Sequence, residues 1–120
     1  MTVVLDSHVL TRLAGDRARF AELRRRGEWP AIVASVVLTG ALTGDHDRDY
    51  DENRLLHTCD VRQVDETVAR SAARLKARTQ TRRVPSAVDA IVVATADDAA
   101  GATVLSSNPS DLRALAPKCR

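Results

Sequence analysis

The chain has few aromatic residues and almost no cysteine. Aromatic side chains make up only 2% of its 120 residues, so a hydrophobic core must be built from aliphatic side chains. The three aromatic residues, Phe20, Trp29 and Tyr50, are too scattered to form a platform on which nucleic-acid bases stack. Cys59 and Cys119 are the only cysteines, which excludes a disulfide framework and the ligand spacing of a zinc site.

Long apolar runs are also missing. No run approaches the roughly 18 residues that a membrane-spanning helix needs, and no basic region of the kind that opens a signal peptide precedes the first apolar stretch. We therefore expect a cytoplasmic protein without a membrane partner. The length fits a single domain over residues 1–120, and the 44% of hydrophobic residues is enough to supply its core.

The net charge of +2 is too small to indicate a nucleic-acid-binding protein by itself. The distribution of arginine is more informative, because it gathers in two segments. These residues are Arg17, Arg19, Arg24, Arg25 and Arg26, and then Arg70, Arg74, Arg78, Arg82 and Arg83. Their guanidinium groups suit phosphate or carboxylate partners, but the same pattern is typical of solvated helix faces. The sequence leaves both interpretations open.

Short apolar runs alternate with helical patterns along the chain. The runs predict buried strands at residues 2–5, 31–34, 61–64 and 103–105. N-cap residues and helical spacing predict helices that begin near Asp6 or Ser7, Asp16, Ser35, within 45–56, and at Asp65, Ser86 and Pro109. The helix from Ser35 is expected to continue to Gly44. This order predicts an α/β fold with a short parallel sheet of about four strands, flanked by helices on both faces.

Polar and acidic residues stand where strands end. Asp6 follows the first strand, Asn108 and Asp111 follow the fourth, and Asp89 lies in the first turn of the helix at residues 86–100. Positions beyond the carboxyl ends of parallel strands converge on one edge of the sheet. Carboxylates gathered there repel one another, and Mg²⁺ or Mn²⁺ is the common compensation because these cations prefer oxygen ligands.

Each of these acids also has a purely structural interpretation. Ser86 to Asp89 and Asn108 to Asp111 both match a capping box, in which the residues at its two ends satisfy free amides of the first helical turn. Asp6 is a suitable N-cap for the first helix. Three caps predicted to meet at one sheet edge nevertheless favour a site, and one residue can do both.

Three segments carry a family resemblance. Residues 3–10 (VVLDSHVL) resemble the first motif of the PIN-domain family, in which an aspartate ends strand one. Residues 86–96 (SAVDAIVVATA) resemble its third motif, and residues 101–112 (GATVLSSNPSDL) resemble its fourth. Length, motif order and spacing are similar to those of VapC-type toxins of bacterial toxin–antitoxin pairs. The resemblance covers essentially the whole chain.

The resemblance implies a PIN-like three-layer domain with metal-dependent endoribonuclease activity. Asp6, Asp89 and Asp111 would be catalytic and would hold Mg²⁺ or Mn²⁺, with Asn108 as a further metal ligand or as an orienting group. The substrate implied is a structured RNA such as tRNA, hydrolysed by metal-activated water. A VapB-type antitoxin and a homodimer are the partners implied.

The chain departs from the family pattern at three positions. Residues 35–42 (SVVLTGAL) resemble the second motif, but Gly40 stands where the family carries a glutamate. Asn108 replaces a common aspartate, and His8 stands where a small hydroxyl residue is commoner. Gly40 supplies no ligand, which leaves a degenerate family member or a disarmed nuclease as explanations. The alternative function is a non-catalytic PIN-like module that binds antitoxin or RNA without cleaving.

A second acidic pattern is predicted to be irrelevant to metal binding. Aspartates alternate at positions 45, 47, 49 and 51, like the start of an EF-hand loop. That loop would need Gly in place of Tyr50 and Glu in place of Leu56. Asp45 is also expected to point away from position 40, so it is a poor substitute for the missing glutamate.

Overall fold

The computed structural model describes residues 2–78 and 86–106 of the 120. Within these ranges, four short strands form one sheet in which every pair is parallel. The strands are β1 (Val3–Leu5), β2 (Ile32–Ala34), β3 (Asp60–Arg62) and β4 (Thr103–Leu105), in the spatial order β3-β2-β1-β4. The predicted parallel sheet is thereby confirmed.

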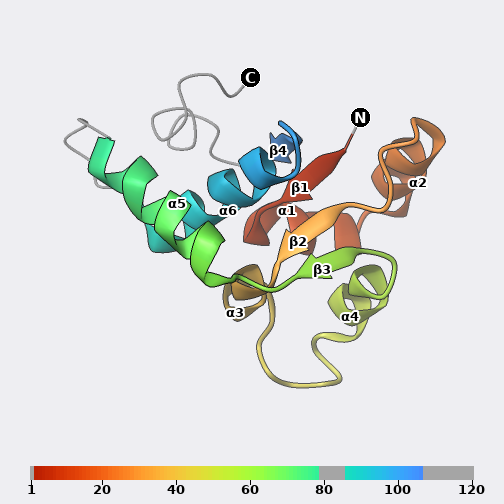
Figure 1. Ribbon diagram of the computed structural model, residues 1–120. Helices are drawn as coiled ribbons and strands as arrows, with labels where there is room; N and C mark the ends of the chain where they lie inside the picture. The colour runs from red at the N-terminus through yellow and green to blue at the C-terminus, as the bar shows by residue number, and fades with distance from the viewer. Residues whose placement is uncertain (1, 79–85, 107–120) are drawn as a thin grey trace.

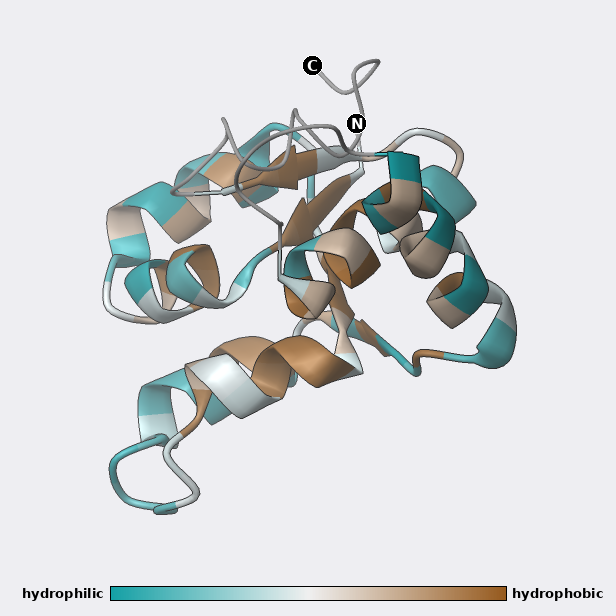
Figure 2. Ribbon diagram, turned by 90° about the vertical axis from the view of Figure 1, so that its left-hand side faces the viewer, coloured by the Kyte–Doolittle hydropathy of each residue, from teal (hydrophilic) through white to brown (hydrophobic). Residues whose placement is uncertain are grey.

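Helices cover both faces of this sheet. They are α1 (Ser7–Ala14), α2 (Arg17–Arg25), α3 (Leu38–Ala41), α4 (Tyr50–Leu56), α5 (Glu66–Arg78) and α6 (Ala87–Asp98), with a 3₁₀ turn η1 (Ser35–Val37). In Figures 1 and 2, α1, α2 and α4 lie on one side of the sheet and α6, with α5 packed against it, on the other. This is the three-layer α/β architecture expected of a PIN-like domain.

The core is built from strands β1 and β2 and from helix α6. Val4, Leu5 and Val33 are fully buried, because these two strands are covered on both faces. Val92 of α6 packs into the sheet cluster, whereas Val93 packs against α5. Figure 2 shows hydrophobic residues concentrated in the central strands, whereas the surrounding helices carry both hydrophobic and hydrophilic residues. Aliphatic side chains therefore supply most of the core, as the low aromatic content requires.

Most of the predicted helix starts are confirmed by capping hydrogen bonds. Asp16 Oδ1 accepts from the amide of Arg19 at 3.0 Å, and Asp65 Oδ1 accepts from the amide of Val68 at 2.9 Å. Helix α6 ends at Asp98, and Gly101 in the following turn has φ of +80°, a conformation that favours glycine. Local capping chemistry therefore decides where these helices begin and end.

The predicted single helix from Ser35 to Gly44 is wrong. The segment forms the 3₁₀ turn and then one short turn of α-helix, and at Leu42 the backbone is already extended with φ −104° and ψ 146°. The reason lies in a competing acceptor. The amide of Thr43 donates to the carboxylate of Asp49 at 2.9 Å instead of continuing the helix. Gly40, a poor helix former, adds to the tendency to stop.

Two further outcomes concern strand boundaries and coverage. The third strand begins one residue earlier than predicted and ends at Arg62, because its register pairs Ile32 with Asp60.

The helix predicted from Pro109 lies outside the described residues. None of the helices in residues 2–78 and 86–106 has the length and hydrophobicity that a membrane span needs.

Candidate functional site

The strand order creates a topological switch point between β1 and β4. The chain leaves β1 toward β2 on one side, while β4 lies on the other side. In open parallel sheets, ligands bind beyond the carboxyl ends of the two strands at such a point. Asp6 directly follows β1, and its amide donates a hydrogen bond of 3.2 Å to the carbonyl of Leu105 at the end of β4. The chain therefore leaves β4 next to Asp6.

Asp6 is the best-defined residue of the predicted site. It is only 8% exposed, and its Oδ1 accepts from the amide of Val9 at 2.9 Å, which confirms the capping role. Its carbonyl accepts from the amide of Leu10 at 3.0 Å. An ionised carboxylate has two oxygens with about four acceptor positions. One capping bond therefore leaves room for a cation on the same side chain.

Asp89 lies at the same edge of the sheet by the topology of α6. This helix leads through a short turn into the start of β4, so its first turn lies at the carboxyl ends of the strands. Asp89 stands three and four residues before Val92 and Val93, both fully buried, and so shares their side of the helix. The topology brings Asp89 and Asp6 to one edge from opposite ends of the sequence.

Only half of the predicted capping box of Asp89 is formed. Ser86 Oγ accepts from the amide of Asp89 at 3.1 Å. The carboxylate of Asp89 makes no hydrogen bond to any residue in the described ranges, so it does not return the bond to Ser86. Its partial exposure leaves this carboxylate accessible from solvent.

The remaining members of the predicted set, Asn108 and Asp111, lie outside the described residues. In the part of the chain that the structure describes, no three His, Cys, Asp or Glu residues gather closely enough to hold a metal ion. The described part of the predicted metal site consists of Asp6 and Asp89. A fuller site requires ligands from after Ser106 or from a partner molecule.

Position 40, where the family pattern has glutamate, lies against the start of α1. A Cβ built on Gly40 would lie 3.3 Å from Ser7 Cβ and 3.4 Å from Ser7 Oγ. Ser7 immediately follows Asp6 in the sequence. A side chain at position 40 would therefore start beside the residue next to the best-defined acid of the site.

A solvent-open depression of about 390 Å³ lies between α1 and α3. It is lined by Ser7, His8, Thr11, Arg12 and Gly40. Sequence reasoning did not identify this feature. The sequence indicates the α1 side of the depression, because Ser7 and Thr11, and likewise His8 and Arg12, are polar residues one helical turn apart. The approach of α3 to α1 has no signal in the sequence.

The alternating aspartates shape their own loop. Asp49 is 4% exposed, and its carboxylate accepts from the amide and hydroxyl of Thr43 and from the amide of Gly44, each at 2.9 Å. The bond from the Thr43 amide is the main cause that lowers the pKa of Asp49, although burial acts in the opposite direction. Asp45 Oδ1 accepts from the amide of Asp47 at 2.9 Å. These acids therefore have a structural function.

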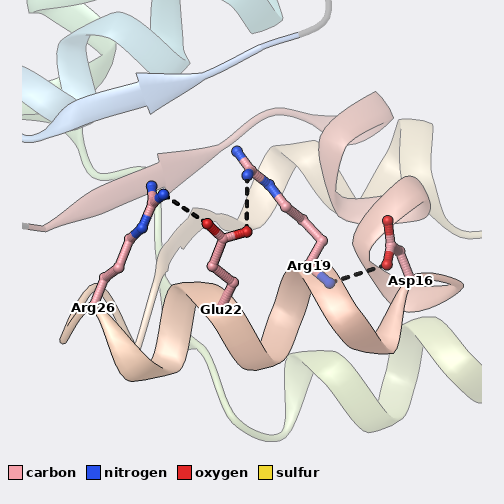
Figure 3. Close-up of polar contacts among 4 residues, drawn as sticks. All are labelled: Asp16, Arg19, Glu22 and Arg26. Carbon is pink, nitrogen blue, oxygen red and sulfur yellow. Dashed lines mark hydrogen bonds and ion pairs between the residues drawn. The ribbon is translucent and has the colours of Figure 1, made fainter.

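The first arginine segment is partly neutralised on its own helix (Figure 3). Glu22 lies between Arg19 and Arg26, with contacts of 3.3 Å and 2.6 Å. In the second segment, Arg70 pairs with Glu66 at 3.0 Å. Exposed pairs of this kind contribute about 0–1 kcal/mol and open easily.

One acidic residue was missed by sequence reasoning. Glu52 of α4 has its Oε2 buried without a hydrogen-bond partner among the described residues. Buried carboxylate oxygens are rarely left unpaired. No sequence signal distinguishes Glu52 from the neighbouring acids.

The described site thus consists of two carboxylates at a switch point, beside a depression that lacks a side chain at position 40. Carboxylate oxygens suit a cation, whereas the guanidinium group of Arg12 in the depression suits an anion. Comparison of the sequence with protein-family models found no family that matches, and comparison with curated proteins found no match either.

Proposed function

We propose that this chain is a metal-dependent endoribonuclease of the VapC type. The observation that carries the proposal is the position of Asp6 at the switch point, where its amide bonds to the end of β4. The first turn of α6 brings a second carboxylate, Asp89, to the same edge. The ordered resemblance to three PIN motifs supports a nuclease over other uses of such an edge.

The proposed cation is Mg²⁺ or Mn²⁺. Asp6, Asp89 and Asp111 would hold it and Asn108 would assist, since all four offer the oxygen donors that these cations prefer. When bound, the cation supplies a positive charge for the phosphate and lowers the pKa of water. Asp6 suits this role because two backbone hydrogen bonds and one side-chain hydrogen bond fix its position.

The proposed partners are RNA, for example tRNA, a VapB-type antitoxin and a second copy of the chain. Exposed arginines on α2 and α5 support the proposed RNA and antitoxin partners. Arg74 and Arg78 are exposed on α5, and Arg17 and Arg25 are exposed on α2. Guanidinium groups in these positions can bind the RNA backbone or an acidic segment of an antitoxin.

The second candidate is a module that binds RNA or antitoxin without cutting. Gly40 favours it, because its position beside Ser7 provides no carboxylate where the family pattern has one. Removal of one carboxylate from a cation site weakens binding of the cation, and turnover depends on that cation.

Cleavage of a mixed RNA pool by the chain and by Gly40→Glu, with Mg²⁺, Mn²⁺ or EDTA, distinguishes the two candidates. Thr39→Glu is the matched control, because it adds the same carboxylate at the neighbouring exposed position of α3. Metal-dependent cleavage that rises in Gly40→Glu but not in Thr39→Glu supports a disarmed nuclease. No cleavage by any of the three proteins supports the binding module and contradicts the nuclease.

The fold of Gly40→Glu must be checked by circular dichroism. The new Cβ starts 3.3 Å from Ser7 Cβ, so Ser7 has to move by a few tenths of an ångström. The Ser7→Ala, Gly40→Glu double variant removes the nearby hydroxyl and relieves part of this contact.

A further inference from the structure

We propose that the depression between α1 and α3 binds a phosphate group of the RNA backbone, next to the bond presented to Asp6. The inference rests on the proposed nuclease function for its position beside the reacting phosphate. The binding itself follows from the lining of the depression. Ser7 connects the two features, because it lines the depression and directly follows Asp6.

The lining offers hydrogen-bond donors and no carboxylate. Arg12 supplies a guanidinium group, His8 an imidazole and Ser7 a hydroxyl. The hydroxyl of Thr11 donates to the carbonyl of Ser7 at 3.1 Å, so it is already engaged. A surface with this composition favours an oxyanion over a cation, in contrast to the neighbouring edge with Asp6.

Arg12 is available for such a ligand. Its side chain makes no hydrogen bond or ion pair within residues 2–78 and 86–106, whereas Arg19, Arg26 and Arg70 each pair with a glutamate. The planar guanidinium group presents two parallel donors that match two phosphate oxygens. Arg12 is also exposed, so an RNA strand can reach it without rearrangement of the fold.

Gly40 keeps the depression open and free of negative charge. A side chain at position 40 would begin 3.3 Å from Ser7 Cβ and occupy part of the space. A glutamate there would also place a carboxylate beside the bound phosphate and repel it. His8 and Gly40, two of the departures from the family pattern, line the same depression.

Binding in EDTA tests this proposal without any need for cleavage. A short single-stranded RNA of mixed sequence is titrated by fluorescence anisotropy against the chain, Arg12→Gln and Arg48→Gln. Arg48 is the control, because it is an exposed arginine outside α2 and α5 that makes no ion pair with the described residues. We expect Arg12→Gln to weaken binding about tenfold, the effect of one charge-assisted hydrogen bond. The slope of binding against salt should also fall by about one.

A second measurement locates the phosphate. Inorganic phosphate is titrated into the ¹⁵N-labelled chain, and the amide resonances of residues 7–12 and Gly40 are expected to shift together. In Gly40→Glu the same shifts should be much smaller. Arg12→Gln changes an exposed side chain, so its folding does not limit the test if Gly40→Glu is unstable.

Three results would overturn the proposal. The first is an equal loss of RNA binding in Arg12→Gln and Arg48→Gln, which indicates diffuse attraction. The second is a phosphate response that leaves residues 7–12 unchanged. The third is a response to phosphate without any Arg12-dependent binding of RNA, which would assign the depression to another anion. Failure of all variants to cleave RNA with added metal would contradict the nuclease alone, because the binding results are obtained in EDTA.

Discussion

The amide of Asp6 donates a 3.2 Å hydrogen bond to the carbonyl of Leu105, so the pairing of β1 with β4 continues one residue beyond β1. On its other side, Asp6 caps α1 through the amide of Val9. Hydrogen bonds to both the sheet and α1 thus fix the position of Asp6. A residue fixed in this way is a suitable base for a metal site, because such sites need ligands held on rigid elements.

Leu10→Ala is expected to destabilise the domain by about 2–5 kcal/mol, because it leaves a cavity under α1. Leu10 is fully buried in the cluster that joins α1 to the sheet. Val61→Ala is the control, since Val61 is 41% exposed on an edge strand. Urea unfolding measures both free energies. Similar losses in the two variants would contradict the packing described for α1.

Asp49 should make the stability of the chain depend on acid pH. Its pKa is lowered from the ordinary value of 3.8, mainly by the bond from the Thr43 amide. A lowered pKa in the folded state contributes stability above the unfolded pKa, and this contribution disappears as the pH falls through the folded pKa. The melting temperature should therefore fall below about pH 3.8, and this fall should be smaller in Asp49→Asn.

Asp49→Asn keeps the size of the side chain but cannot ionise. Its effect therefore reports the loss of the charge and not a change in packing. At neutral pH it should melt at a lower temperature than the original chain. Asp47→Asn, at an exposed position of the same loop, should change neither the melting temperature nor its pH dependence appreciably. Identical acid profiles for the original chain and Asp49→Asn would show that Asp49 does not contribute in this way.

Cys59 is expected to react slowly with alkylating reagents. Burial raises the pKa of its thiol from 9.0 to about 11, although a hydrogen bond with Thr58 acts in the opposite direction. Since only the thiolate reacts, alkylation by iodoacetamide at pH 8 should be about a hundredfold slower in the folded chain than in denaturant. Mass spectrometry of a Cys119→Ser variant measures this rate for Cys59 alone. Equal rates in the two states would contradict the burial.

The parts of the fold that the sequence predicts correctly are those governed by short-range chemistry. Strand β4 has the predicted bounds, Thr103–Leu105, and α6 starts after Ser86 as its capping motif indicates. Asp16 and Asp65 cap their helices for the same reason. In the three helices the decisive contact joins residues three apart, so the information lies within one helical turn.

The parts that were wrong or missed depend on contacts between segments. The helix from Ser35 stops early because Asp49 binds the amide of Thr43, six residues before it. The depression exists because α3 approaches α1, which brings Gly40 to Ser7 from 33 positions further along the chain. Neither contact has a local pattern. For the site, the topology places Asp6 and the first turn of α6 at the carboxyl ends of the strands, whereas Asn108 and Asp111 lie outside the described residues.

The most direct test of the proposed metal-dependent nuclease compares Asp6→Asn with Asp16→Asn. Each aspartate caps a helix through the amide three residues later, and asparagine caps about as well, so both variants should remain folded. Helix α1 starts at the carboxyl end of β1 and runs away from it. Asp16, which follows the last turn of α1, therefore lies away from the carboxyl ends of the strands. The two variants therefore make the same change to a capping residue and differ in their position relative to the proposed cation.

The measurement is the rate of RNA cleavage with Mg²⁺ or Mn²⁺, in the original chain or, where that is too slow, in the Gly40→Glu background. We predict that Asp6→Asn lowers the rate about a hundredfold or more, in line with the several kcal/mol that a catalytic metal contributes. Asp16→Asn should leave the rate nearly unchanged. Metal-dependent cleavage that survives in Asp6→Asn would contradict the central role given to this residue.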